Sequence, residues 1–321
     1  MISNLPRLTV ILFLVTASLP LRAADKVLVL TALPVTYSIS KTLADGTSIN
    51  VENVPESGRP MNSLENFFST RAANYADLFK RADAVVTIGK LWHSDPLFTA
   101  ARAENIRVID IDATAPWSTT LSGISVAPVP VEDVSWADRA AGERELSVYF
   151  WLSLANGARM ADIVARDLSR LSPDDADLIA ANLAAFRKNL LDLKHEYEVK
   201  LATLTDVTVF ALAPEYIYLA TDMGLFVDGN FFKQDIDWTA ADLENFRNYL
   251  EANSIRVVLH KWVPDEKILA ALTAAGARLV VLDLLDGGSN GETMDQDAYL
   301  NRIRGNLENL YQALALNSGS R

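Results

Sequence analysis

The sequence predicts an α/β protein of two lobes, each with a parallel-type sheet flanked by helices, joined by one long rigid connector helix. Short β-branched runs alternate with helical apolar spacing in both halves of the chain, which is typical of βαβ units. One uninterrupted helical stripe separates the halves, and 321 residues with 50% hydrophobic composition suffice for two domains. We therefore expect an N-terminal lobe at 24–171, the connector at 172–204 and a C-terminal lobe at 205–321.

The first 23 residues have the pattern of a signal peptide. Arg7 provides a basic start, residues 8–19 are mostly apolar, and 21–23 offer a cleavage site before Ala24. This run is shorter than the roughly 20 residues of a membrane-spanning helix. The chain has no cysteine, which excludes disulfides and a lipid-modified cysteine. We expect an exported, periplasmic protein without a lipid anchor.

The charge of the chain disfavours some partners. The formal net charge is -12, and removing residues 1–23 deletes two arginines and no acid, which makes it -14. Acidic proteins bind nucleic acids and anionic lipids poorly. We expect no nucleic-acid partner, no membrane insertion after signal cleavage, and a monomer.

In both halves, the expected strands are short β-branched runs separated by helical patterns. The strands are expected at 26–31, 49–54, 84–88 and 107–111 in the first half, and at 207–211, 256–259 and 278–282 in the second. The helices between them are expected at 70–82, with Ala73, Leu78 and Phe79 on one face, and at 240–252 and 265–275.

The connector helix has the clearest sequence pattern. Ser172 and Pro173 form a helix start, and the acids Asp174 and Asp175 face its positive end. About 30 helical residues span roughly 45 Å, enough to run along two lobes. The stripe that defines the helix has a spacing of three and four residues; its members are Ile179, Leu183, Phe186, Leu190, Leu193, Tyr197, Leu201 and Leu204.

Three further segments complete the organisation. A last helix is expected at 295–314, with an apolar face that includes Tyr299 and Leu307, after an exposed glycine-rich loop at 286–291. Residues 118–145 are the least regular part of the chain. They are interpreted as a long surface loop, with a flap near the cleft as the alternative.

Several stretches, in this order, resemble the zinc- and manganese-binding periplasmic solute-binding proteins of ABC importers, the helical-backbone metal receptors of cluster A-I. The stretches are Thr-Ala-Leu-Pro-Val at 31–35, Tyr-Ala-Asp-Leu at 75–78, Lys-Arg-Ala-Asp-Ala-Val-Val at 80–86, Tyr-Leu-Ala at 218–220 with Gly-Leu at 224–225, and the helix from Tyr299 to Leu314. The resemblance covers nearly the whole mature chain. It implies capture of a transition-metal cargo such as zinc or manganese for an inner-membrane permease.

The resemblance also implies a ligand set of three histidines and one carboxylate, a set that suits these metals. Here the matching positions hold Met61, Tyr149 and Ala213 in place of the histidines, whereas Asp283 keeps the carboxylate. A family glutamate corresponds to Lys261. The resemblance therefore implies the fold but not the usual metal site.

The candidate ligand-binding residues lie at strand ends, where parallel sheets bind ligands. They are Asp283, Tyr149, Met61, Glu215, His260 and Lys261, with Trp92 and Trp151 as aromatic residues of the cleft. Three hypotheses stay open: a rebuilt metal site, a site for a metal complex or small organic ligand that Lys261 and His260 contact, and an accessory interaction protein without metal. A thioether favours soft ions, whereas tyrosinate and carboxylate favour hard ones.

Each candidate also has a purely structural interpretation. His260 can be a satisfied core histidine, Met61 and Tyr149 can fill space, and Asp283 can pair with Lys261. His93 and His195 are expected at the surface. The sequence contains no cysteine nucleophile, phosphate-binding glycine loop, His-Glu-x-x-His motif or nucleophile elbow, so we expect no catalytic activity and no cofactor besides a metal cargo.

Overall fold

A computed structural model describes residues 26–118, 120–137, 145–287 and 295–318. The expected signal peptide at 1–23 and most of the glycine-rich loop at 286–291 lie outside the described residues. The described helices include none that is long and apolar enough to cross a membrane.

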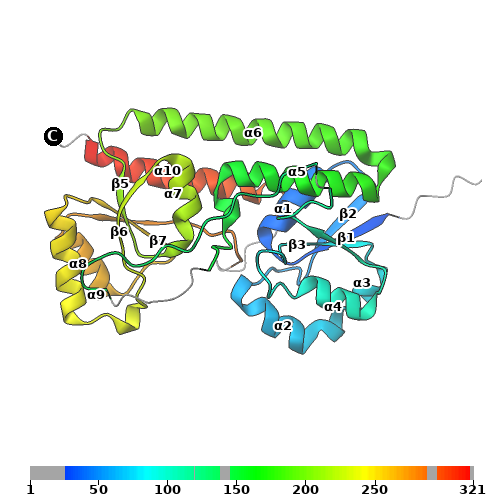
Figure 1. The fold of residues 1–321 in the computed structure, drawn as a ribbon, viewed down its shortest axis with the longest axis horizontal. Coiled ribbons are helices and arrows are strands. Elements are labelled where there is room, and N and C mark those ends of the chain that lie inside the picture. Colours follow the sequence, from blue (N-terminus) through cyan, green and yellow to red (C-terminus); the bar gives the residue numbers. More distant parts are fainter. Residues whose placement is uncertain (1–25, 119, 138–144, 288–294, 319–321) are drawn as a thin grey trace, which may run out of the picture.

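The N-terminal lobe contains a four-stranded parallel sheet with the order β2-β1-β3-β4 (Figure 1). Each strand lies within two residues of its predicted position, because β-branched runs bounded by polar residues define it well. The strands are β1 (Val27–Thr31), β2 (Ile49–Asn53), β3 (Ala84–Thr87) and β4 (Ile109–Asp112).

The C-terminal lobe repeats this topology with the order β6-β5-β7-β8, again all parallel. Its strands are β5 (Thr208–Ala211), β6 (Phe226–Asn230), β7 (Val257–His260) and β8 (Arg278–Val281). The sequence analysis missed β6, an edge strand that contains Asp228, Gly229 and Asn230, which are residue types depleted in strands. The predicted fold class is confirmed, and the two sheets share one strand order.

One predicted helix of the N-terminal lobe is wrong. Residues 70–82 do not form a single helix: α2 (Leu64–Arg71) and α3 (Ala76–Arg81) are separated by a 3-10 turn, and Ala73 is exposed. The break lets aromatic rings of both helices pack together, since Phe68 and Phe79 are both buried with ring centroids 6.3 Å apart. The other helices of this lobe are α1 (Pro34–Leu43) and α4 (Leu97–Glu104).

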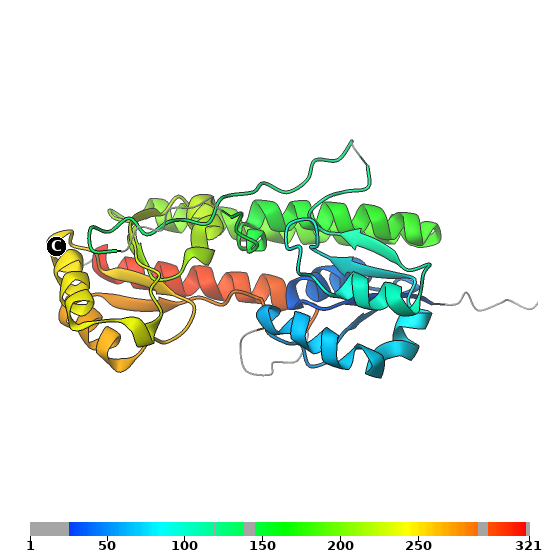
Figure 2. The same ribbon diagram turned by 60° about the horizontal axis from the view of Figure 1, so that its bottom comes forward.

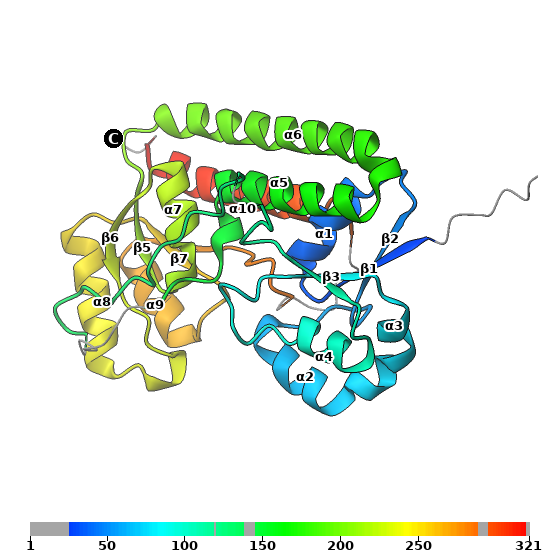
Figure 3. The same cartoon turned by 45° about the vertical axis from the view of Figure 1, so that its right-hand side comes forward.

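The connector prediction is confirmed as a helix. A short 3-10 turn at Pro173–Asp175 leads into α6 (Ala176–Ala202), which runs across both lobes (Figure 3). Six residues of the predicted stripe are buried, and Leu183 and Leu204 are partly buried. His195, on the opposite face, is exposed as expected.

Two long helices lie under α6. Helix α5 (Leu154–Leu171) precedes it in the chain, and α10 (Ala298–Ser318) ends the fold. Figure 2 shows α10 extending from the N-terminal lobe into the C-terminal lobe. Its start is fixed to α1, because Ser38 Oγ accepts a hydrogen bond from the Tyr299 N–H at 3.0 Å. The boundaries 171/172 and 204/205 stay predictions, since α10 contacts both lobes.

The remaining helices cover the second sheet. They are α7 (Ile217–Met223), α8 (Ala240–Ala252) and α9 (Glu266–Ala274). Helix α8 begins with a capping box in which the Thr239 hydroxyl accepts from the Asp242 N–H and the Asp242 carboxylate accepts from the Thr239 N–H. One continuous apolar core includes α5, α6, α10 and residues of both sheets, so the lobes are joined by buried surface and not only by a linker.

Residues 120–137 of the irregular segment form a strap that crosses to the C-terminal lobe. The strap follows β4 and covers the free edge of β6: the Asp133 carboxylate accepts from the Asn230 N–H at 2.6 Å, and the Asp133 N–H donates to the Asn230 carbonyl at 3.3 Å. The Trp136 ring packs edge-on against Tyr249 at 5.3 Å. The described part of the segment (118, 120–137 and 145) contains no helix or strand, which agrees with the predicted loop, and it is anchored to the opposite lobe.

Candidate functional site

The site begins at the carboxyl ends of β5, β7 and β8. After β5, a 3-10 turn at Pro214–Tyr216 carries Glu215 and the buried Tyr216. The Tyr216 hydroxyl lies 3.0 Å from the His260 carbonyl oxygen and 2.9 Å from the Leu282 carbonyl oxygen. This one side chain therefore fixes the ends of three neighbouring strands relative to one another.

Glu215 and Lys261 form an ion pair. The Lys261 ammonium contacts Oε1 of Glu215, and the Glu215 side chain is 9% exposed. Lys261 also lies over the Trp262 ring, with Nζ 4.9 Å from the ring centroid. A buried carboxylate requires such a partner, because an unpaired buried charge is strongly destabilising.

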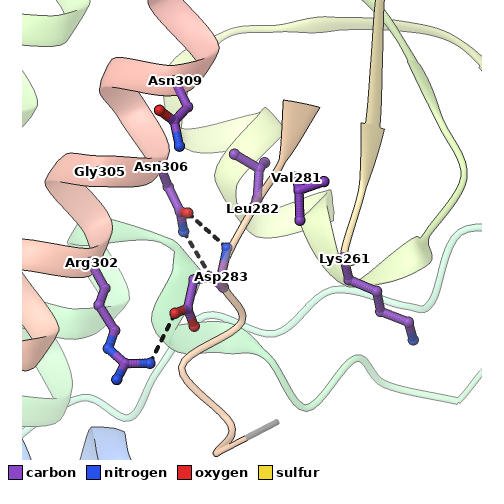
Figure 4. Close-up of a pocket in the computed structure, with 8 residues that line it drawn as sticks. All are labelled: Lys261, Val281, Leu282, Asp283, Arg302, Gly305, Asn306 and Asn309. Carbon is purple, nitrogen blue, oxygen red and sulfur yellow. Dashed lines mark hydrogen bonds and ion pairs between the residues drawn. The ribbon is translucent and has the colours of Figure 1, made fainter. Parts of the chain in front are cut away.

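Asp283 pairs with an arginine that the sequence analysis did not single out. Its Oδ2 accepts from Arg302 of α10 at 2.9 Å, and its Oδ1 accepts from the Leu285 N–H at 2.7 Å (Figure 4). Asn306 exchanges two hydrogen bonds with the Asp283 backbone, at 2.8 and 2.7 Å. Leu285 has φ of 55°, a conformation that the Asp283 carboxylate helps to hold. The structural alternative that Asp283 pairs with Lys261 is wrong, because Lys261 pairs with Glu215 and Figure 4 shows its side chain pointing away from Asp283.

Tyr149 lies beside a second acid. Its hydroxyl donates to Oδ2 of Asp286 at 3.4 Å. Burial raises the pKa of the Tyr149 phenol, and the nearby carboxylates of Asp286 and Glu215 raise it further. Tyr149 is therefore a neutral phenol in this arrangement, whereas the sequence analysis considered a tyrosinate.

Two candidates are part of the core. Met61 is 4% exposed, and its N–H donates to the Asp286 carbonyl at 2.9 Å. Trp151 is fully buried, and its indole N–H donates to the Leu284 carbonyl at 2.8 Å. Both side chains are buried, so they do not line an open cleft in this structure. The loop at 284–286 is held by the Met61 backbone N–H and by the Trp151 indole.

Trp92 lies apart from this group. It belongs to the loop between β3 and α4 and is partly buried against the core. Within the described part of the chain, no hydrogen bond or ring contact joins it to Tyr149 or Trp151. The neighbouring His93 is exposed, as expected.

His260 has its ring nitrogens engaged locally. Nδ1 accepts from the Lys261 N–H at 2.9 Å, and Nε2 lies 3.8 Å from Oδ1 of Asp235. Burial is the main cause that lowers the pKa of His260 from 6.5 to about 4; Asp235 opposes this shift and Lys261 adds to it. The interpretation of His260 as a satisfied, neutral core histidine agrees with this geometry.

The lowered pKa predicts a loss of stability in acid. His260 takes up a proton near pH 6.5 in the unfolded chain but only near pH 4 in the folded chain. The neutral ring therefore makes its full contribution to the free energy of unfolding above pH 6.5, and this contribution is lost as the pH decreases toward 4. We expect the wild type to lose about 2 kcal/mol more between pH 7.5 and 4.5 than His260→Gln does. Urea unfolding of both proteins at the two pH values checks this.

The comparison with His260→Gln removes the contribution of other groups. Burial raises the pKa of Asp95 to about 6, which gives a pH dependence of opposite sign, but Asp95 is present in both proteins. Parallel stability profiles of the two proteins would contradict the neutral assignment of His260.

In this structure, the acids at the strand ends do not form a closed metal site. The described residues include no group of three His, Cys, Asp or Glu side chains close enough to hold one ion. Instead, two cations balance two acids, and a groove of about 320 Å³ lies between them. The groove is lined by Lys261, Val281, Leu282, Asp283, Arg302, Gly305, Asn306 and Asn309. Whether the candidate residues bind a ligand stays a prediction.

The sequence analysis missed Arg302, Asn306, Tyr216 and Asp286 as site residues. Arg302 and Asn306 are four residues apart and share one face of α10, and this spacing was the available signal. Tyr216 and Asp286 gave no comparable signal.

The chain is similar to known proteins over most of its length. A family profile described as "Zinc-uptake complex component A periplasmic", ZnuA, matches residues 29–313. A zinc-binding protein AdcA of Streptococcus pyogenes serotype M1 is 24% identical over 164 residues, which are 50% of this chain and 32% of that protein. The match thus spans about a third of the length of this curated relative.

Solved structures share the fold. A mutant of FpvC from Pseudomonas aeruginosa superposes with a TM-score of 0.67 at 19% identity, over 90% of this chain and 100% of that one. The Zn(II)-bound ZnuA-like domain of Streptococcus pneumoniae AdcA gives a TM-score of 0.63 at 19% identity, over 90% of this chain and 99% of that one. At these identities the likeness shows the fold alone.

Proposed function

Because the chain belongs to the family of the periplasmic zinc-uptake complex component A, we propose that it is the solute-binding receptor of an ABC importer and that its cargo is a divalent transition-metal ion. The receptor acts in the periplasm, as a monomer without catalytic activity, and passes the ion to a permease in the inner membrane. The family description supports the compartment and the class of protein.

The donor atoms at the strand ends are the basis for the proposed metal cargo. Met61 is enclosed by the core and His260 is engaged with its neighbours, so the remaining donors are oxygens: the carboxylates of Glu215 and Asp283 and the phenol of Tyr149. Oxygen ligands suit manganese, whereas zinc prefers imidazole and thiolate. Manganese is therefore the preferred cargo, ahead of zinc.

Cargo binding requires rearrangement, because the described acids do not converge on one point. A ligand stabilises the closed arrangement only through contacts that are stronger there than in the open one. The buried core shared by the lobes supports a small adjustment of side chains and of the loop at 284–286, and not a wide hinge motion.

A cellular uptake experiment tests this function. In a strain that lacks the gene, we expect manganese accumulation at low external manganese to fall and to return with the wild-type gene. Asp283→Asn should not restore it, because the substitution removes a charged ligand while keeping the size of the side chain. Asp177→Asn, at an exposed position in the first turn of α6, is the matched control and should restore uptake. Normal accumulation of all metals in the deletion strain would contradict the proposal.

The groove between Lys261 and Arg302 favours a second candidate cargo, a metal held by a small anionic chelator or an organic anion. Its volume of about 320 Å³ lies at the lower end of small-molecule pockets. Its polar lining consists of two cations, two amides and the Asp283 carboxylate, which is paired with Arg302. Titration with manganese citrate beside manganese alone distinguishes the candidates: binding only of the complex would favour this one.

A further inference from the structure

The buried carboxylate of Glu215 is only half satisfied. Oε1 contacts the Lys261 ammonium, whereas Oε2 is buried and has no hydrogen-bond partner among the described residues. A carboxylate offers two oxygens to a cation, so one ligand position of Glu215 remains available. Among the described residues, the Lys261 ammonium is therefore the counter-ion of the Glu215 carboxylate.

Lys261 is anchored through its backbone, whereas its ammonium lies next to solvent. Its backbone N–H donates to His260 Nδ1 at 2.9 Å, which anchors the residue at the end of β7. Its ammonium lies between Glu215 and the Trp262 ring, and Trp262 is 45% exposed. The ring offers the ammonium a favourable position next to solvent, so the lysine can leave Glu215 without entering an apolar environment.

The second ion pair of the site is built differently. The Asp283 carboxylate has two partners, Arg302 and the Leu285 N–H, and it helps to hold the backbone turn at Leu285. Both oxygens of the Asp283 carboxylate thus accept a hydrogen bond, one from Arg302 and one from the Leu285 N–H. Of the two acids, Glu215 is the one with an oxygen that has no partner among the described residues.

We infer that the Lys261 ammonium is a tethered competitor for the cargo cation: it occupies Glu215 in the cargo-free protein and must be displaced when the metal binds. This inference rests on the proposed metal cargo. A tethered group competes at a high effective concentration. The measured association constant is the intrinsic one multiplied by the fraction of protein in which the acid is available. The lysine therefore weakens cargo binding and returns to Glu215 when cargo leaves.

Calorimetric titration with Mn(II) tests the inference on the purified mature protein and three variants. Lys261→Met removes the ammonium and keeps the length of the side chain, and we expect it to tighten Mn(II) binding by about tenfold or more. Lys261→Arg retains a competing cation and should bind like the wild type. Lys267→Met on α9, whose ammonium donates to the Trp238 carbonyl at 3.3 Å, removes a lysine that has no acid partner in the described structure and should leave the affinity unchanged.

A second variant protects the test against loss of folding. Lys261→Met leaves the buried Glu215 without its counter-ion, which can destabilise the protein. Lys261→Gln keeps a hydrogen-bond donor for Glu215 and is therefore measured in parallel. Thermal melts check that each variant is folded. The combination of Lys261→Met with Glu215→Gln should lose the gain in affinity, because the competed acid is absent.

The outcomes separate the inference from the proposed function. If the wild type binds Mn(II) and the folded variants Lys261→Met and Lys261→Gln bind no more tightly, the inference is overturned and the metal cargo stands. If only the variants bind, the competition is supported and metal cargo of the wild type is overturned. If no protein binds any ion, both fail.

Discussion

Gly157→Ala is expected to lower the free energy of unfolding by about 3 kcal/mol, a large effect for one methyl group. A Cβ at Gly157 would overlap the hydroxyl oxygen of Tyr299 and lie 2.7 Å from its Cζ. Tyr299 is fully buried, and its hydroxyl donates to the Trp151 carbonyl at 2.7 Å. The ring also packs against Phe186 of α6 with centroids 6.0 Å apart, so neither the hydroxyl nor the ring can move freely.

This effect is large because α5, α6 and α10 meet at this point and join the lobes. Chemical unfolding measures it, and the melting temperature should fall by about 8 °C. Gly305→Ala is the matched control: Gly305 lies in α10, a Cβ there meets nothing within 4 Å, and the substitution should be neutral or stabilise by about 0.5 kcal/mol. Equal stability of Gly157→Ala and the wild type would show that the three helices are not packed in this way.

Gly287→Ala is expected to disturb the contact between the loop at 284–287 and the N-terminal lobe. Gly287 has φ of 83°, and a Cβ there would overlap the Arg59 carbonyl oxygen and lie 2.7 Å from its carbonyl carbon. The neighbouring Asp286 carbonyl accepts the Met61 N–H at 2.9 Å, so the same displacement breaks this hydrogen bond. We expect a loss of about 2–4 kcal/mol from backbone strain and overlap together.

Gly224→Ala separates the two causes. Gly224 ends α7 with φ of 65°, but a Cβ there meets nothing within 4 Å, so only the strain of about 1 kcal/mol remains. Hydrogen exchange of the Met61 amide should rise in Gly287→Ala and not in Gly224→Ala. Unchanged protection of Met61 in Gly287→Ala would contradict a close contact between these loops.

The fold could be predicted in large part because its signals are local. The apolar stripe from Ile179 to Leu204 predicted α6, and the β-branched runs predicted seven of the eight described strands. The prediction failed where tertiary packing decides. Strand β6 is stabilised by its pairing with β5 and by the strap, and the break at residues 72–75 follows from the packing of Phe68 on Phe79.

The site could be predicted only in part. Strand ends were predicted correctly, so Glu215, Lys261 and Asp283 could be identified from the sequence as candidates. Their pairing could not be predicted, since Lys261 and Glu215 are 46 residues apart and Arg302 lies on a helix that returns from the other lobe. The sequence also gives no measure of enclosure, which is why Met61 and Trp151 were expected to line a cleft that they instead help to close.

Equilibrium dialysis of the purified mature protein against Mn(II) and Zn(II), with metal content determined by mass spectrometry, tests the proposed metal cargo most directly. We predict stoichiometric Mn(II) in the wild type and its loss in both Asp283→Asn and Glu215→Gln. Absence of bound metal in the folded wild type, or stoichiometric metal unchanged in both variants, would contradict a metal receptor that uses the strand-end carboxylates.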